Sequence, residues 1–428
     1  MAGDKVMLKY FYLSDDWSAN AINHCFNYLT AITGIRFSGN SESPEIFRDR
    51  GTESGTLKLK LDKYQQSDSI AGDALILYHD PINLLLQKLS AKISRGPFAE
   101  HKNLHDKPTS GSSISQIINL FINDLKKAGL IPEYYKSLAI WPEKSKFGVS
   151  VTHDVDIIRR SVAGSLKLMF KQNINGKFQG LADSIRSAIG DAPNPYGRIG
   201  EWIRLEKELN IRSTYFIFAG ERLFQNDPKY PLPWLSDSIS MLKDSGFEIA
   251  LHNSAGGFNG NGIEKAKLLL AEFAGTEIWG IRPHYLSFNS VNYWDKIHGL
   301  GFKYSSCLGF DDDIGYIDGI DLPMMPFDTN RDRPLGIIEI PLAIMDCGLI
   351  GQNLSAIEIV ERGVQLIDST AAQNGLVVFD WHQRSLYEPE FPGWKDVFLK
   401  LIDHCRKNGG AIMTMREIAD KIEANLNY

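Results

Sequence analysis

The 428-residue sequence has few cysteines, no long apolar run and no excess of basic charge, and each absence excludes a class of protein. The four cysteines (Cys25, Cys307, Cys347 and Cys405) are scattered without a C-x-x-C pair, so we expect reduced thiols rather than a disulfide framework or a thiolate zinc site. No uninterrupted apolar window of about 18 residues is present, so no membrane span is expected. Lys and Arg number 46 against 52 Asp and Glu, and this net charge of −6 gives no basis for binding nucleic acid.

The first residues contain no apolar run of the length found in signal peptides, so we expect a cytoplasmic protein. Hydrophobic residues make up 43% and charged residues 23%, as in ordinary globular proteins. The length suffices for two or three domains, and the sequence carries no signal for an oligomeric state.

Residues 1–145 predict a small α/β accessory domain without a recognisable catalytic constellation. The predicted strands are 8–16, 56–62 and 73–79, and the predicted helices are 17–35, 81–94 and 113–130. The polar segment 102–115 is expected to be a loop, and 141–146 a linker. The histidines of this region (His24, His79, His101 and His105) lack the spacing of a metal site and are interpreted as surface or packing residues.

Residues 146–428 alternate short apolar segments with amphipathic ones. The predicted strands are 146–156, 213–219, 247–252, 278–285, 303–307, 336–346, 375–382 and 410–415, and the predicted helices are 201–210, 234–246, 263–275, 356–375 and 394–410. Such alternation favours a parallel sheet, and the length suits a (β/α) barrel. The stretch 171–200 breaks the rhythm and is interpreted as an excursion over the active face.

Ionisable side chains follow four of these strands, at the end where parallel α/β folds collect ligands. They are Asp154 and Asp156, then His252, then Arg282 and His284, and finally Asp380 and His382. Residues two apart in a strand share a face, so each of these pairs is expected to project together, and His153 away from them. Taken singly, such an Asp is more often a cap or turn residue and such a His a packing residue, but four coincident strand ends favour one site.

Two neighbouring carboxylates repel each other unless a cation lies between them, which favours a metal site. One or two carboxylates with two imidazoles suit Zn²⁺, Co²⁺, Mn²⁺ or Fe²⁺ with an open water position. Such an ion lowers the pKa of water to about 7 and polarises a carbonyl group. With a carboxylate as base and an imidazole as acid, the set suits amide or ester hydrolysis.

The order of these motifs resembles that of the polysaccharide deacetylase superfamily, also called the NodB-homology domain or carbohydrate esterase family 4. The likeness is strongest to a divergent bacterial branch with an extra N-terminal domain. THDVD (152–156) resembles the T-F-D-D-G motif, ALHNSAGGF (250–258) the H-[ST]-x-x-H motif, RPHYLSF (282–288) the Arg-x-Pro motif and FDWH (379–382) the last motif. The resemblance covers 146–428 and implies a distorted (β/α) barrel of NodB-homology type.

The resemblance also implies residue roles. Asp154 matches the catalytic base, with Arg282 orienting it. Val155 stands where the family has its metal-binding Asp, so we expect Asp156 to bind the metal instead. Only the first motif histidine is present, as His252, and we expect His284 to replace the second, for which Gly256 stands. The expected cofactor is one divalent ion, zinc before cobalt, manganese or iron, held by Asp156, His252 and His284.

His382 matches the general acid, oriented by Asp346 or Asp380, although a helix cap is an equal alternative for Asp346. Tyr285, Trp381 and Phe258 are candidate sugar-stacking residues, and each is equally compatible with the core. The run Asp311 to Asp313 lies in a segment that also resembles the divergent branch, and a solvated loop is favoured over a substrate contact.

These assignments predict a metal-dependent hydrolase that removes an acetyl group from an N-acetylated or O-acetylated sugar, on a glycan precursor inside the cell. A hydrolase of another non-peptide C–N bond on the same fold is an alternative. A non-catalytic glycan-binding protein is another, because the second motif histidine is missing. Acetate release and metal content would distinguish the three.

Overall fold

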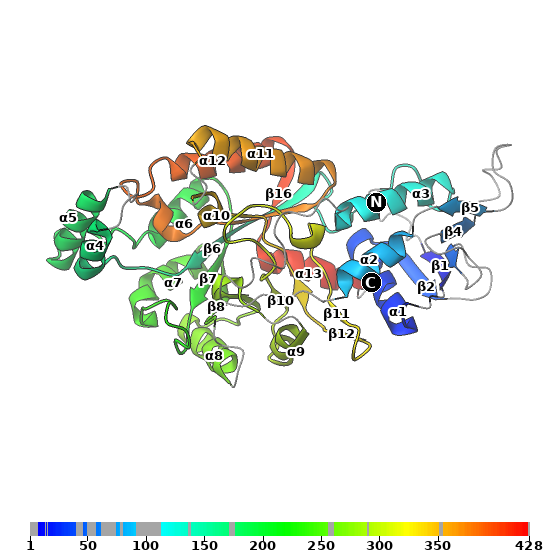
Figure 1. Ribbon diagram of the computed structural model, residues 1–428, viewed down its shortest axis with the longest axis horizontal. Coiled ribbons are helices and arrows are strands. Elements are labelled where there is room, and N and C mark those ends of the chain that lie inside the picture. Colours follow the sequence, from blue (N-terminus) through cyan, green and yellow to red (C-terminus); the bar gives the residue numbers. More distant parts are fainter. Residues whose placement is uncertain are drawn as a thin grey trace.

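A computed structural model describes residues 7–12, 14, 16–39, 46–48, 57–60, 74–77, 80–90, 113–135, 138–170, 176–255, 261–288, 291–350 and 354–426. Figure 1 shows an elongated molecule with a barrel-like body in the middle, an N-terminal sheet at one end and the helices α4 (Val162–Met169) and α5 (Lys177–Ala188) at the other. Within the described residues, no helix combines the length and apolar character that crossing a bilayer requires.

The central body is a nine-stranded sheet in which every strand pair is parallel. Along the sheet the strands are β13 (Ile338–Glu339), β10 (Tyr304–Ser305), β9 (Gly280–Pro283), β8 (Glu248–Asn253), β7 (Thr214–Phe218), β6 (Phe147–Val155), β15 (Leu376–Asp380) and β14 (Ile344–Met345), with β16 (Gly410–Ile412) beside the start of β6. All nine residues of β6 are buried, as expected for a strand covered on both faces.

The sheet is curled rather than flat. Seven strand spacings of about 4.8 Å would separate β13 from β14 by about 34 Å in a flat sheet. The chain passes from Glu339 to Ile344 in five residues, which span at most about 18 Å. The amide of Ile340 donates to Ser305 O on one edge (2.8 Å), and the amide of Ala343 donates to Val378 O on the other (3.0 Å). The two edges therefore approach each other, and the predicted distorted (β/α) barrel is confirmed.

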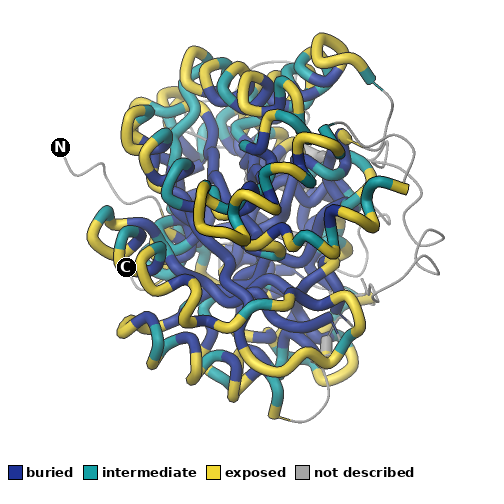
Figure 2. Tube along the Cα trace, turned by 90° about the vertical axis from the view of Figure 1, so that its left-hand side faces the viewer, coloured by how far each residue is buried: buried dark blue, intermediate teal, exposed yellow. Residues whose placement is uncertain are grey.

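Helices cover the outside of the sheet, so that the buried residues form a central column beneath an exposed helical layer (Figure 2). They are α6 (Ile199–Glu208), α7 (Ser236–Asp244), α8 (Gly262–Ala274), α9 (Val291–Gly299), α11 (Ala356–Ala372), α12 (Trp394–Lys407) and α13 (Met415–Leu426). Helix α11 begins with a capping box in which Ser355 and Glu358 bond each other's backbone amides.

The N-terminal region forms its own five-stranded sheet in the order β2 (Arg36–Gly39), β1 (Met7–Tyr12), β3 (Ile46–Arg48), β4 (Leu57–Lys60) and β5 (Ala74–Leu77). Its helices are α1 (Ala19–Thr33), α2 (Pro81–Leu89) and α3 (Ile114–Lys127). Helix α1 packs against α13, His24 Nε2 lies 2.7 Å from Met325 O, and the Tyr28 hydroxyl donates to Pro323 O. His24 is therefore a packing residue, whereas His79, His101 and His105 lie outside the described residues.

One predicted strand is divided in two. The segment 336–346 was expected to be continuous, but it forms β13 and β14 on opposite sheet edges. Pro341 lies between them, and a proline has no amide hydrogen to donate to a neighbouring strand. The short strands β11 (Phe327–Asp328) and β12 (Arg333–Pro334) had no clear sequence signal. Of the predicted excursion 171–200, residues 177–188 form α5, and α4 begins earlier, at Val162.

Candidate metal and catalytic site

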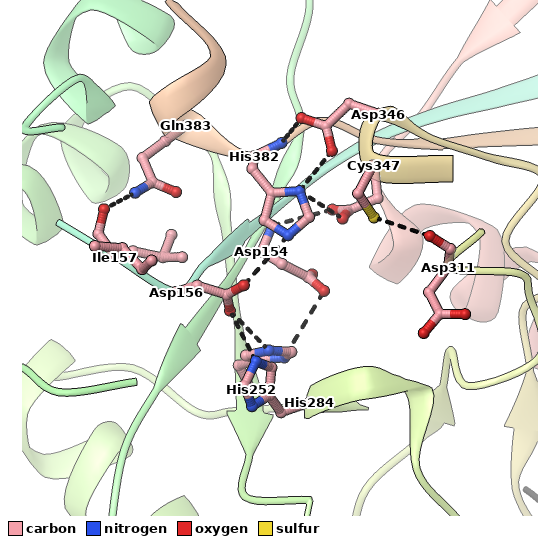
Figure 3. A network of polar contacts seen from close by, with 12 residues as sticks. Asp154, Asp156, Ile157, His252, His284, Asp311, Asp346, Cys347, His382 and Gln383 are labelled. Carbon is pink, nitrogen blue, oxygen red and sulfur yellow. Dashed lines mark hydrogen bonds and ion pairs between the residues drawn. The ribbon is translucent and has the colours of Figure 1, made fainter. Parts of the chain in front are cut away.

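The ends of β6, β8, β9 and β15 bring the predicted acids and histidines together (Figure 3). Asp156 lies at the centre of the cluster. Its Oδ1 is 3.2 Å from His252 Nε2 and 3.8 Å from His284 Nε2, and its Oδ2 is 3.3 Å from His382 Nε2. Side chains separated by more than two hundred positions in the sequence therefore surround one carboxylate.

Asp156, His252 and His284 have the donor set and spacing of a metal site. Their ligand atoms all lie within 4.8 Å of one another. Two ligand atoms bound at 2.0–2.2 Å to one tetrahedral zinc ion would lie about 3.4 Å apart, which is close to the two distances from Asp156 Oδ1. Asp156 Oδ1 and His252 Nε2 are buried and make no hydrogen bond among the described residues. Such orphaned polar atoms are costly unless they bind a group such as an ion, so these residues fit a divalent cation.

The outer nitrogens of both imidazoles are fixed by hydrogen bonds. His252 Nδ1 lies 2.9 Å from the backbone oxygen of Arg282, and His284 Nδ1 lies 3.2 Å from Asp227 Oδ1. A hydrogen bond donated from Nδ1 leaves the lone pair on Nε2, which then faces Asp156. Both rings are therefore held in the tautomer that a metal ligand requires.

Asp227 was not found by reasoning from the sequence. It lies between β7 and the 3-10 helix η2 (Leu232–Leu235), where no strand end marks it. Its carboxylate also accepts hydrogen bonds from the Ser254 hydroxyl and from the backbone amides of Phe224 and Ala255. Although burial alone would raise it, the bond from His284 helps to hold the pKa of Asp227 below its ordinary value. The Asn-Asp-Pro turn at 226–228 was the only sequence signal.

The backbone after His284 turns sharply. Tyr285 and Leu286 have φ values of 58° and 50°, in the left-handed region that residues with a Cβ rarely adopt. Strain of this kind costs about 1–3 kcal/mol for each residue and clusters at functional sites. This turn places His284 at the end of β9 and Tyr285, which is 36% exposed, in the lining of the cavity.

Arg282 links the predicted base to the sheet. Its Nη1 donates to Asp154 Oδ1 (2.8 Å) and to Asp380 Oδ1 (3.1 Å), and its other nitrogens donate to the oxygens of Ser306. Asp154 is buried, which alone would raise its pKa, but the Arg282 guanidinium beside it holds that pKa below the ordinary value. Asp154 is therefore a carboxylate at neutral pH, with its orientation fixed by a charge-assisted bond.

His382 is oriented by Asp346. The Nδ1 atom lies 2.6 Å from Asp346 Oδ1, and the His382 amide donates to Asp346 Oδ2 (2.9 Å). Burial opposes the charged imidazole, but the Asp346 carboxylate and further acids hold the pKa of His382 well above its ordinary value. A protonated imidazole with Nε2 facing the centre of the cluster can donate a proton there.

The structure separates the two candidates for the orienting acid. Asp380 Oδ2 is 3.8 Å from His382 Nδ1, too far for a hydrogen bond, so Asp346 and not Asp380 takes that role. Asp380 instead accepts bonds from the Asp154 amide and from the Thr152 hydroxyl. Burial and the nearby Asp154 charge raise its pKa. Asp346 is also the first residue of α10 (Asp346–Ile350), but its side chain is committed to His382.

Trp381 does not line the site. Its side chain is fully buried and packs against Trp394 and Phe398, because it lies on the face of its strand opposite to Asp380 and His382. The expected sugar contact is therefore wrong for Trp381, and its second interpretation as core holds. His153 also points outward, where its ring lies 3.0 Å from Glu206. Phe258 and Gly256 lie outside the described residues.

Asp346, Cys347 and His382 form a second group of closely spaced donor atoms. Burial raises the pKa of the Cys347 thiol to about 12, so it is not a thiolate at neutral pH. Its Sγ donates to Asp311 O, and His382 Nδ1 is already bonded to Asp346. This group is a poorer metal site than the one around Asp156.

The site opens into a cavity of about 1080 Å³, slightly above the usual range of about 300–1,000 Å³ for ligand pockets. Asp154, Asp156, His284 and His382 line it, and α4 contributes Gly164, Lys167 and Leu168 to its lining. Helix α4 precedes the expected excursion 171–200, and of the described residues of that excursion Tyr196 lines the cavity.

Comparisons with known proteins return solved structures only. No family model matches the chain, and no curated protein sequence matches it. One is a protein from Mycobacterium smegmatis assigned as a polysaccharide deacetylase. Its sequence identity to this chain is 19% and the TM-score is 0.45, and the match covers 66% of this chain and 92% of that one. For a CE4 family pseudoenzyme from Bacillus anthracis, the sequence identity is 12% and the TM-score 0.33, and the match covers 66% of this chain and 67% of that one. For the peptidoglycan deacetylase PdaC from Bacillus subtilis, the sequence identity is 10% and the TM-score 0.33, and the match covers 66% of this chain and 94% of that one.

Proposed function

We propose that this protein is a metal-dependent hydrolase that removes an acetyl group from an acetylated sugar. The observation that supports it most is the arrangement around Asp156. Two buried ligand atoms without hydrogen-bond partners, Asp156 Oδ1 and His252 Nε2, lie beside an oriented third ligand, His284, and between a carboxylate and a protonated imidazole. A metal site flanked by one base and one acid is what hydrolysis of an amide or ester requires.

The proposed cofactor is one divalent ion, zinc first, held by Asp156, His252 and His284. When bound, it would lower the pKa of a water molecule and polarise the acetyl carbonyl. Asp154, kept ionised by Arg282, takes up the proton of the attacking water. His382, kept protonated by Asp346, donates a proton to the departing nitrogen or oxygen of the sugar. The products are acetate and the free amine or alcohol.

The remaining residues hold this arrangement in place. Asp380 anchors Arg282 and the Asp154 amide, and Asp227 keeps the ring of His284 turned toward Asp156. Tyr285 presents a half-exposed ring to the cavity, a surface on which the apolar face of a sugar can stack.

The test is acetate release from a panel of N-acetylated and O-acetylated sugars. The protein is first freed of metal with a chelator and then reconstituted with zinc, cobalt, manganese or iron. We expect activity only after reconstitution, and a decrease of about 10²- to 10⁴-fold when Asp154 is changed to Asn or His382 to Ala. A protein that binds the ion but releases no acetate from any substrate would contradict the proposal.

The ligand set is tested separately by titrating zinc into the His284→Ala variant. We expect a marked loss of affinity, because two ligands cannot hold the ion as three do. His298→Ala is the matched control, since that histidine is in α9 and not in the cluster. Undiminished affinity in His284→Ala would exclude the assigned role of His284.

A further inference from the structure

Arg384 lies directly beside the catalytic cluster, on the 3-10 helix η5 (Gln383–Leu386) that follows His382. The backbone there is fixed on both sides. The Ser385 amide donates to His382 O (3.0 Å), the Tyr387 amide donates to Arg384 O (2.9 Å), and the Gln383 side chain donates to Ile157 O (2.6 Å). A side chain that extends from this turn is therefore held at a defined place relative to His382.

Arg384 lines the cavity, yet its side chain makes no hydrogen bond or ion pair with any described residue. The other arginines in or near the cavity have partners or lie in solvent, since Arg159 is exposed and stacks over the Trp234 ring. Arg160 bonds Glu390 and Ser165, and Arg282 bonds Asp154 and Ser306. Five N–H donors on a half-buried, permanently charged group are costly to leave unused, so an unengaged arginine here points to a ligand.

The nearest acids do not supply the missing partner. Asp156 and Asp346 are the main carboxylates that act on Arg384 electrostatically. Asp346 is committed to His382 through both oxygens, and Asp156 faces three imidazoles. In the proposed enzyme, Asp156 also binds the cation. Arg384 then keeps a positive charge without a matching anion in the protein.

The adjoining wall carries two further cations beside the acids Asp227, Asp311 and Glu390. Lys167 on α4 and Lys229 after β7 line the cavity and make no ion pair with any of the residues that the structure describes. The cavity, at about 1080 Å³, is at the upper end of the size of ligand pockets. The wall therefore leaves room for a substituent beyond the sugar ring and presents cations to it.

We infer that the substrate carries an acidic group, a carboxylate or a phosphate, which Arg384 binds through a charge-assisted, two-point contact. This inference rests on the proposed function, because it names the class of acetylated sugar that the same site accepts. A guanidinium matches the planar geometry of both acids, whereas a neutral sugar would leave its charge unanswered.

The experiment compares three acetylated sugars that differ in charge: the methyl glycoside of N-acetylglucosamine, N-acetylglucosamine 1-phosphate and the corresponding N-acetylated uronic acid. Acetate release is measured for the wild type, Arg384→Gln and Arg384→Lys. For the preferred acidic sugar, we expect kcat/KM to fall about 10- to 100-fold in Arg384→Gln and to recover partly in Arg384→Lys. For the neutral sugar, we expect less than about a threefold change. Whichever acidic sugar shows the larger loss identifies the group as phosphate or carboxylate.

Arg186→Gln is the matched control, since it removes an exposed arginine of α5 that is paired with Asp191 outside the cavity. Equal losses for neutral and acidic sugars in Arg384→Gln, or no loss for either acid, would overturn the inference while leaving the deacetylase proposal intact. If no sugar is hydrolysed, the deacetylase proposal fails, and the inference is decided by calorimetric binding of the two acidic sugars to the zinc-loaded protein. Binding that Arg384→Gln does not weaken, or no binding at all, would then overturn it.

Discussion

Replacement of Asp346 by Asn tests the proposed acid most directly. The Asp346 carboxylate lies 2.6 Å from His382 Nδ1 and stabilises the imidazolium. With an effective dielectric constant of about 20 and charge centres about 4 Å apart, that attraction is worth about 4 kcal/mol. Loss of this attraction should lower the pKa of His382, although Asp156 and Asp380 remain nearby.

The sign of the effect follows from the role of the group. A general acid must be protonated, so activity is lost as the pH rises through the pKa of His382. Asp346→Asn should therefore move the alkaline limb of the pH–rate profile to lower pH, and lower kcat by about 10²- to 10⁴-fold at neutral pH. The assay is acetate release by the zinc-loaded protein between about pH 6 and pH 10, with wild type and variant in the same metal state.

Asp368→Asn provides a matched control. It removes the carboxylate that lies 2.6 Å from the Nε2 of His404, the same separation but on the exposed surface of α11 and α12. We expect its pH–rate profile to coincide with that of the wild type. An alkaline limb that stays in place in Asp346→Asn would refute the reasoning, even if the rate fell, because it would show that Asp346 does not set the protonation of His382.

Three further predictions concern the surroundings of the site. Asp227→Asn should weaken zinc binding about 10- to 100-fold, measured by competition with a chromophoric chelator, because His284 loses the carboxylate that orients it; unchanged affinity would contradict that role. Tyr285→Ala should raise KM for the sugar about two- to tenfold, whereas Trp381→Phe should leave KM unchanged, and steady-state kinetics would expose an error if the two behaved alike. Burial disfavours the charged form of His153, but Glu206 raises its pKa above the ordinary value. The protonated ring therefore stabilises the fold fully below about pH 6.5, and this stabilisation is lost as the pH rises through the raised pKa. In denaturant titrations, His153→Asn should thus cost more free energy of unfolding at about pH 6 than at about pH 9, and an equal cost would contradict the assignment.

The sequence was sufficient to predict most of the parallel strands, several of the helices and the convergence of side chains at the site. Periodicity located each of the main parallel strands, because buried strands read as short apolar runs between amphipathic helices. The two-residue repeat placed Asp154 and Asp156 on one face and His153 on the other, and the structure has them so. These features depend on local geometry, which a single sequence records.

The parts that sequence reasoning missed depend on contacts between distant segments. Asp227 lies in a loop without periodicity, and only the fold shows that it reaches His284. The choice between Asp346 and Asp380 could not be made from spacing, because each lies at or near the end of a predicted strand and either could be adjacent to His382. Arg384 has no distinguishing pattern either, since an unpaired guanidinium is recognised by its surroundings and not by its neighbours in the chain.

The crossing from Glu339 to Ile344 couples assembly of the barrel to competence of the site. Asp346 follows β14 immediately, and β14 reaches His382 only because the chain steps from one sheet edge to the other around Pro341. If that seam opened, the remaining parallel strands would keep their pairing, yet His382 would lose its orienting carboxylate. The protein would then be folded but inactive, because the ligands of the ion would stay together while the proposed proton donor would no longer be oriented.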